Sequence, residues 1–281
     1  MLAYWNGRYL PQEQITVSPD DRGFLFADGL YEVIRSYRGR LFRSADHLER
    51  LNNGARALRL KTTDFNDLAD ITANLIEENR LAEGEATVYI QVTRGTATRT
   101  HRFPPPETAL TVYAAVKPFF PHVDDLADGV NVILVSDQRW ARCDVKTVGL
   151  TANVLANQAA HEQQAAEAVF VRDGALLEGT HTNLFAVYDG VVVTPPKTNY
   201  ILGGITRMAV LEICRKTGIP CREAPLFESD LDRAEELMIV GTTTEVTPVV
   251  RIHGRPFRTG RPGAITMRLQ KDLQELTRQP A

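Results

Sequence analysis

Apolar and polar residues alternate along several stretches of the first third of the chain, a pattern that is typical of half-buried β-strands. The clearest stretch covers 31–37, turns at Arg38-Gly39 and returns through 40–42. Near the start, Asn6-Gly7 lies between aromatic-rich flanks, which is the signature of a two-residue β-hairpin. Two further strands are predicted over 86–93 and 108–116.

Between these strands the apolar residues recur at helical spacing. Ser44 is predicted to cap a first helix, whose apolar face consists of Leu48, Leu51, Ala55 and Leu58. A second helix is predicted from Phe65, Leu68, Ile71 and Leu75. Strands and helices therefore share the N-terminal part of the chain.

The rest of the chain predicts a second set of strands and helices. A buried strand is expected over 130–135, an alanine-rich helix over 151–164, and hairpins around Asp173-Gly174 and Asp189-Gly190. Thr206 is predicted to cap a helix that ends near Lys216. Another strand is expected over 236–240 and a terminal helix over 264–277.

The Pro-containing stretch 117–122 interrupts this pattern and is interpreted as an interdomain linker. We therefore expect an α+β protein with an N-terminal domain over 1–117, a linker over 118–123 and a C-terminal domain over 124–281. A chain of 281 residues is long enough for two domains with their own cores.

Composition narrows the class of protein. The net charge of -3 carries no nucleic-acid or membrane signature, and no apolar run is long enough to span a bilayer. The N-terminus has no signal-peptide pattern, and the three cysteines are odd in number and lack metal-type spacing. The histidines are too scattered to indicate a metal site. We expect a cytoplasmic protein that binds small molecules and no metal.

Three features suggest a specific chemistry by their order along the chain. Lys146 supplies an amine, Glu178 a carboxylate, and Gly203-Gly204 opens a predicted helix whose first backbone amides suit an anion. Each feature alone would be an ordinary surface charge, turn or loop. Together they match the requirements of pyridoxal phosphate (PLP), which needs a lysine amine, an acid at the ring nitrogen and a phosphate site.

These residues resemble the fold-type IV PLP enzymes, which include branched-chain aminotransferases, D-amino acid aminotransferases and aminodeoxychorismate lyases. The resemblance extends from Asn6-Gly7 to the final helix and is greatest to the D-amino acid aminotransferases. It implies a small N-terminal α/β domain, a larger C-terminal pseudo-barrel domain, and a homodimer with two shared active sites.

The resemblance also implies roles for individual residues. Lys146 would condense with the cofactor aldehyde and later move the substrate proton, while Glu178 would keep the ring nitrogen protonated. Leu202 would pack against the ring, although a core leucine is an equally good interpretation. The phosphate would be bound by Arg50, Ile205, Thr206 and Thr242.

Substrate choice would follow from Tyr31, Arg99 and His101, which match the group that binds the substrate carboxylate in D-amino acid aminotransferases. A planar guanidinium binds a carboxylate through two parallel hydrogen bonds. The pattern implies ping-pong transfer from D-alanine to 2-oxoglutarate or pyruvate. The carboxylate-binding residues would reach across the interface of a homodimer.

Two positions depart from this pattern or leave the substrate side chain open. His181 stands where a run of serines is expected, and it would narrow the pocket, contact the cofactor or simply pack. Arg35 would face either the substrate or solvent. The alternatives are an (R)-selective amine or branched-chain aminotransferase, an aminodeoxychorismate lyase, and a PLP-binding regulatory module without catalysis.

Overall fold

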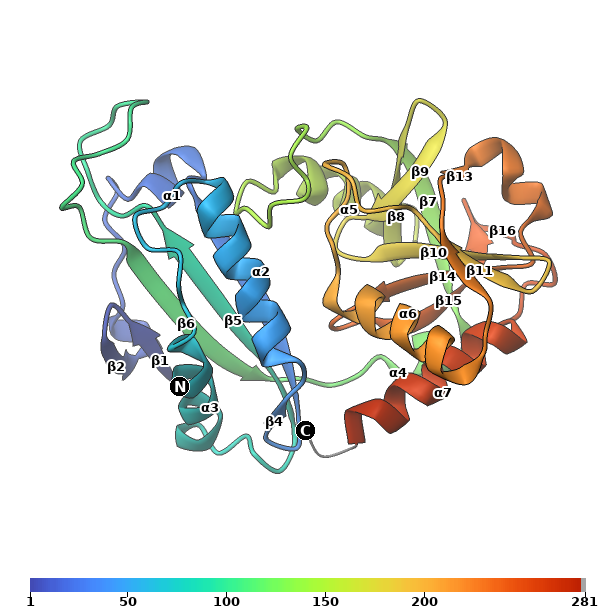
Figure 1. Ribbon diagram of the computed structural model, residues 1–281, viewed down its shortest axis with the longest axis horizontal. Helices are drawn as coiled ribbons and strands as arrows, with labels where there is room; N and C mark the ends of the chain where they lie inside the picture. Colours follow the sequence, from blue (N-terminus) through green and yellow to red (C-terminus); the bar gives the residue numbers. More distant parts are fainter. Residues whose placement is uncertain (279–281) are drawn as a thin grey trace. The chain divides into compact units, whose positions relative to one another are not determined.

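A computed structural model describes residues 1–278 of the chain. The chain forms two compact units, each with its own sheet and helices (Figure 1). Unit 1 contains residues 1–120 and also a short segment from later in the chain, Val145–Leu150. Unit 2 contains Pro121–Asp144 and the chain from Thr151 onward. We predicted one C-terminal domain over 124–281. In the structure residues 145–150 of that range belong to unit 1 instead.

Unit 1 is built on a six-stranded antiparallel sheet with the strand order β2-β1-β6-β5-β3-β4. Its strands are β1 (Leu2–Trp5), β2 (Arg8–Pro11), β3 (Gly29–Tyr37), β4 (Arg40–Leu41), β5 (Glu85–Thr93) and β6 (Thr111–Pro118). The Asn6-Gly7 hairpin is confirmed, because both residues have the positive φ angles that its tight turn needs.

Two helices, α2 (Ser44–Ala57) and α3 (Leu68–Glu78), cover one face of this sheet (Figure 1). The predicted apolar residues Leu48, Leu51 and Ala55 are all in the core. The predicted cap is wrong: Ser44 is the first helical residue, and Arg43 occupies the cap position in a left-handed conformation. A short helix α1 (Arg22–Phe26) was not predicted, since five residues are too few to show a periodic pattern.

Up to Arg278, where the described residues end, unit 2 contains ten strands. They are β7 (Val130–Ser136), β8 (Glu167–Arg172), β9 (Ala175–Gly179), β10 (Asn183–Tyr188), β11 (Val191–Thr194), β12 (Cys221–Glu223), β13 (Leu226–Phe227), β14 (Glu236–Gly241), β15 (Glu245–Ile252) and β16 (Arg255–Pro256). Six of them pair in a closed circuit, β10-β14-β15-β7-β8-β9 and back to β10. The predicted pseudo-barrel is therefore present, and the pairing of Glu178 with Asn183 closes it.

Four helices belong to unit 2: α4 (Val123–Asp128), α5 (Thr151–Glu162), α6 (Ile205–Thr217) and α7 (Ala264–Arg278). Helix α5 connects the parallel strands β7 and β8, as expected for a crossover between parallel strands. Gly204 holds the cap position of α6, so the predicted capping role of Thr206 is wrong. Two short 3-10 helices, Gln12–Gln14 and Glu228–Arg233, complete the fold.

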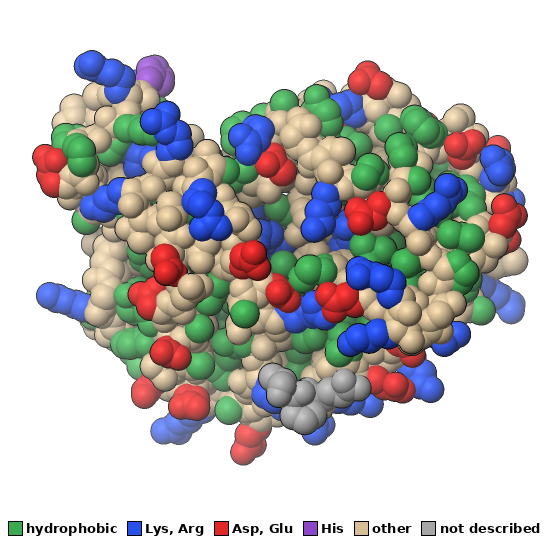
Figure 2. Space-filling model, viewed as in Figure 1, with side chains coloured by type: hydrophobic (Ala, Val, Ile, Leu, Met, Phe, Trp, Pro, Cys, Tyr) green, Lys and Arg blue, Asp and Glu red, His purple; other side chains and the backbone are tan. Residues whose placement is uncertain are grey.

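The visible surface mixes acidic, basic and apolar side chains, as expected for a net charge close to zero (Figure 2). Within residues 1–278, no helix combines the length and the hydropathy needed to cross a bilayer.

Candidate active site

Lys146 belongs to unit 1 because its backbone pairs with the free edge of β3. The amide of Tyr31 donates to the carbonyl of Lys146 at 3.0 Å, and the amide of Val148 donates to the carbonyl of Gly29 at 3.1 Å. A bridge between Leu30 and Thr147 continues this pairing. The segment 145–150 is thus held like an additional edge strand, and strand pairing fixes where the lysine side chain begins.

The Lys146 amine lies 4.2 Å from the centre of the Tyr31 ring. Tyr31 in turn stacks on Tyr89, with 5.9 Å between the ring centres. Burial raises the pKa of the Tyr89 phenol to about 12, and the neighbouring tyrosines add to this shift. Lys146 is half-buried and forms no ion pair with any residue in 1–278. Its amine is therefore available to react with a bound molecule.

Arg50 lies beside β3 and is held by a buried carboxylate. Its Nε and Nη2 donate to the two oxygens of Glu32 at 2.7 and 2.8 Å. His47 contacts the same carboxylate through Nδ1 at 2.9 Å. Burial by itself would raise the pKa of the Glu32 carboxyl, but Arg50 and then His47 hold this pKa well below its usual range. Glu32 stays ionised and keeps Arg50 in one orientation.

Arg99 and His101 lie in the loop between β5 and β6, and both are exposed. Both pack against the ring of Phe26: the Arg99 guanidinium lies 5.2 Å and the His101 ring 5.5 Å from its centre. The structure thus brings two of the three predicted carboxylate-binding residues onto one aromatic side chain. Tyr31, the third, lies next to Lys146.

In unit 2, Glu178 lies on the strand pairing that closes the barrel. Its Oε2 accepts hydrogen bonds from the amide of Leu202 at 2.9 Å and from the side chain of Asn183 at 3.3 Å. Its Oε1 accepts one from Nη1 of Arg139 at 2.5 Å. The side chain is 7% exposed, so this carboxylate is fixed in direction and largely shielded from water.

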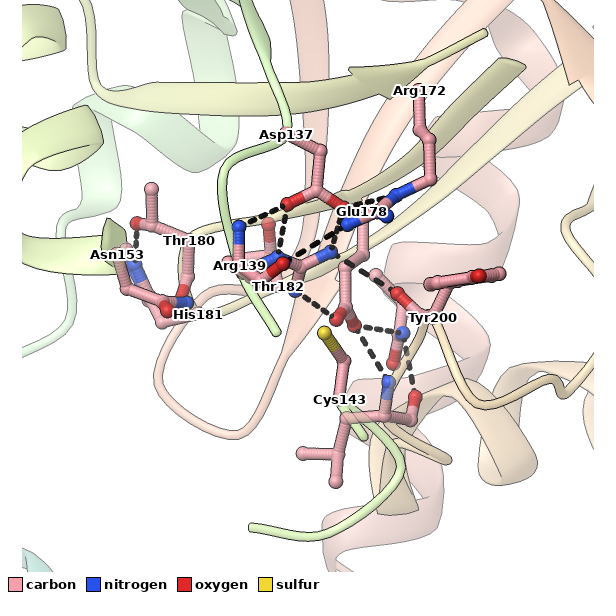
Figure 3. Close-up of polar contacts among 12 residues, drawn as sticks. Asp137, Arg139, Cys143, Asn153, Arg172, Glu178, Thr180, His181, Thr182 and Tyr200 are labelled. Carbon is pink, nitrogen blue, oxygen red and sulfur yellow. Dashed lines mark hydrogen bonds and ion pairs between the residues drawn. The ribbon is translucent and has the colours of Figure 1, made fainter. Parts of the chain in front are cut away.

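Arg139 is itself clamped from its other side by Asp137, whose carboxylate is fully buried (Figure 3). Nε of Arg139 donates to Asp137 at 2.9 Å, and Arg172 donates to the same carboxylate at 3.1 Å. Burial alone would raise the pKa of Asp137, but hydrogen bonds from Arg139 and Arg172 lower it. The Arg139 cation thus lies between two carboxylates, those of Asp137 and Glu178.

The turn that follows Glu178 is organised by another buried carboxylate, Glu167. The hydroxyls of Thr180 and Thr182 donate to it at 2.5 and 3.0 Å. His181 Nδ1 lies 3.1 Å from Oε2 of Glu167, while half of the histidine side chain remains exposed. His181 therefore packs on the turn with one edge of its ring, and its exposed half leaves its three expected roles as predictions.

The start of α6 provides a possible anion site. No side chain caps this helix, so the first backbone amides, including those of Ile205 and Thr206, have no partner within the helix. Gly204 packs against Asn183, and a Cβ atom at Gly204 would overlap Oδ1 of Asn183. Thr242 lies in the tight turn between β14 and β15 and is half-buried.

Each unit carries groups of a kind that PLP needs. In unit 1 the Lys146 amine suits its aldehyde, and in unit 2 the shielded Glu178 carboxylate suits its ring nitrogen and the uncapped start of α6 suits its phosphate. Among residues 1–278, no group of three or more metal-ligating side chains is close enough to hold a metal ion.

Two further side chains can be excluded from the chemistry. Arg35 faces neither solvent nor a substrate, because it is 2% exposed, paired with Glu85 and packed between the rings of Tyr37 and Phe119. Cys143 is a buried thiol whose pKa burial raises to about 11, so it is a poor nucleophile.

The sequence analysis did not assign roles to Asp137, Arg139 or Asn183. Their signal is weak, because Arg139, which Asp137 holds, contacts Glu178 only after strands β7, β8 and β9 have paired. The same holds for Glu32 and His47, which meet across β3 and α2. An acidic residue within a strand otherwise rich in apolar residues was the only hint of Glu32.

Comparison with known proteins identifies the family. Residues 29–252 match the family model described as amino-transferase class IV. The D-alanine aminotransferase of Staphylococcus aureus strain N315 is 38% identical over 273 residues, covering 97% of this chain and 96% of that protein. The chain belongs to the class IV aminotransferases, and it is an aminotransferase.

Solved structures agree with this assignment. The branched-chain amino acid aminotransferase of Escherichia coli has a TM-score of 0.91 at 26% identity, covering 98% of this chain and 94% of that one. A hypothetical aminotransferase of Mycobacterium tuberculosis, solved in a PLP-bound form, has a TM-score of 0.86 at 22% identity, covering 99% of each chain. At that lower identity the second likeness shows the fold alone. The predicted two-domain fold of type IV is confirmed.

Proposed function

We propose that this enzyme transfers the amino group of D-amino acids to 2-oxo acids, with D-alanine and 2-oxoglutarate giving pyruvate and D-glutamate. The observation that carries this proposal is the likeness to D-alanine aminotransferases, at 38% identity along 97% of the chain. The likeness to branched-chain enzymes is lower, at 26% identity. The cofactor is PLP, as in other class IV aminotransferases.

Bound PLP supplies an aldehyde that carries the amino group and a ring that accepts electrons. Lys146 would hold this aldehyde through its amine, and once freed by the incoming amino substrate this amine would move the proton at the substrate α-carbon. Glu178 would face the ring nitrogen, and its negative charge would favour the protonated form of the ring. Arg139 and Asn183 support this role because they fix the Glu178 carboxylate.

Four residues bind the phosphate in this proposal: Arg50, Ile205, Thr206 and Thr242. The backbone amides at the start of α6 provide donors, and Arg50 provides positive charge. Glu32 holds Arg50 by two hydrogen bonds, so the guanidinium loses little further freedom when it binds an anion. Leu202 packs against the ring while its amide holds Glu178.

The substrate carboxylate is bound by Arg99, His101 and Tyr31. The packing of Arg99 and His101 on one phenyl ring supports this assignment, because it places two donors together. A carboxylate held on one side of the cofactor leaves only one enantiomer with its α-hydrogen facing Lys146. The reaction follows a ping-pong course, in which the first oxo acid leaves before the second one binds.

The exposure of Arg99 and His101 supports a homodimer in which each subunit lends these residues to its neighbour. Such a dimer would contain two active sites, each completed by residues of both subunits. The three free cysteines support a reducing, cytoplasmic location.

The proposal is tested by a half-reaction without an amino acceptor. Purified protein should be yellow, and its colour should bleach faster with D-alanine than with L-alanine or (R)-1-phenylethylamine. Lys146→Ala should abolish both the lysine-linked absorption band and turnover. A faster response to L-alanine would favour the branched-chain reaction, and a faster response to (R)-1-phenylethylamine would favour an amine transaminase.

A further inference from the structure

The loop that carries Arg99 and His101 is docked on the segment around α1 by its backbone. The amide of Arg22 donates to the carbonyl of Gly95 at 2.9 Å, and the amide of Ala97 donates to the carbonyl of Asp20 at 3.2 Å. Asp21 and Thr96 add a β-bridge. The base of the loop is therefore anchored, whereas the side chains at its tip are exposed.

Arg22 extends this anchoring toward the tip of the loop. It is 4% exposed, and its Nη1 donates to the carbonyl of Thr100, between Arg99 and His101, at 2.7 Å. Its Nε pairs with Asp28 at 2.9 Å, and Arg94 contacts the same carboxylate. Hydrogen bonds from Arg94 and Arg22 outweigh burial and lower the pKa of Asp28. The backbone between the two exposed residues is thus fixed by a buried guanidinium.

Phe26 then orients the side chains themselves. Its ring lies 4.9 Å from the Arg22 guanidinium, 5.2 Å from the Arg99 guanidinium and 5.5 Å from the His101 ring. An exposed arginine loses rotamer entropy when a ligand orders it. A cation–π contact in the free protein orders it beforehand and reduces this loss on binding.

We propose that Phe26 is a positioning residue for substrate carboxylate recognition, holding Arg99 and His101 in their binding orientation. This inference rests on the proposed function, because it takes Arg99 and His101 as the carboxylate-binding pair. The aromatic contacts of Phe26 are with Arg22, Arg99 and His101, and they include none of the residues proposed for the cofactor. Its loss should therefore weaken carboxylate binding and spare the cofactor.

The test uses PLP-loaded Phe26→Ala with two matched variants. Phe24→Ala removes a neighbouring phenyl group of α1 that is 74% exposed, and Phe26→Trp keeps a larger aromatic face. Phe26→Ala should raise the KM for D-alanine about tenfold, with little change in kcat or in the Kd for PLP. Phe24→Ala should match the unmodified enzyme, and Phe26→Trp should restore most of the affinity.

A second measurement does not depend on catalysis. Hydrogen exchange of peptides from the loop 94–106 should become faster in cofactor-free Phe26→Ala and remain unchanged in Phe24→Ala. In an Arg99→Ala background, Phe26→Ala should raise the KM by less than it does alone, because the contact with Arg99 is already gone.

An unchanged KM in Phe26→Ala, or an equal rise in Phe24→Ala, would overturn the proposal. The proposal would also be contradicted if Phe26→Ala raised the KM as much in the Arg99→Ala background as it does alone, because Phe26 would then act independently of Arg99. If instead the unmodified enzyme prefers L-alanine, the proposed function fails, and hydrogen exchange still shows whether Phe26 orders the loop.

Discussion

At the residue scale, charged side chains in both units are held by partners that are themselves buried. Glu32 holds Arg50 in unit 1, and Asp137 holds Arg139 and Arg172 in unit 2. A buried ion pair is often no more stable than an apolar replacement, but it fixes direction. These pairs therefore contribute chiefly to the orientation of the groups that we propose to meet the cofactor.

Asp137 gives a direct test of this arrangement. Asp137→Asn removes the charge between two guanidinia, leaving Arg172 without its carboxylate partner and Arg139 with Glu178 alone, so the free energy of unfolding should fall by about 3 kcal/mol. The control is Asp144→Asn, which breaks an exposed pair with Arg142 and should cost about 0.5 kcal/mol or less. Urea denaturation of the cofactor-free protein measures both, and similar losses for the two variants would contradict the prediction.

At the element scale, the side chain of Asn183 contacts both the strands that close the barrel and the residues just before α6. Asn183 pairs with Glu178 across the closing strands and donates to both Glu178 and the carbonyl of Leu202. Gly204 leaves room for Asn183 because it lacks a Cβ atom. The acid and the helix terminus are consequently placed by a single local packing arrangement.

Two adjacent glycines test this coupling. Gly204→Ala places a Cβ atom against the amide oxygen of Asn183, so it should displace this side chain and raise the Kd for PLP at least about tenfold. At Gly203 the nearest atom to an added Cβ would be 3.7 Å away, and Gly203→Ala should bind PLP nearly as before. Fluorescence titration of cofactor-free protein with PLP compares the two. Equal affinities would show that Asn183 adjusts without cost.

At the scale of the whole molecule, the proposed dimer predicts complementation between inactive variants. Lys146→Ala and Arg99→Ala should each have little activity with D-alanine. When they are unfolded and refolded together, half of the dimers should be mixed, and each mixed dimer should contain one intact site. About a quarter of the unmodified activity should return. If no activity returned, Arg99 would act in the same active site as the Lys146 of its own subunit.

Much of the fold follows from sequence patterns, because hairpins such as Asn6-Gly7 and long helices such as α7 depend on neighbouring residues. The caps of α2 and α6 were mispredicted, since Arg43 and Gly204 act through backbone conformation rather than through a side chain. Lys146 and Glu178 stood out by chemistry and order. Asp137 did not, because Arg172 reaches it from a distant part of the chain, and Arg139 connects it to Glu178 only in the folded protein.

Because residues 145–150 pair with the edge of β3, the two units cannot be separated by cutting the gene at one position. A fragment ending at Phe120 would lack the segment that carries Lys146, and it would expose backbone groups of β3 that Lys146 and Val148 otherwise pair. Unit 1 is made of two separate stretches of the chain. A chimera with a single crossover point would therefore combine parts of unit 1 from two different proteins. Chimeras that transplant 1–120 together with 145–150 should be the ones that remain soluble.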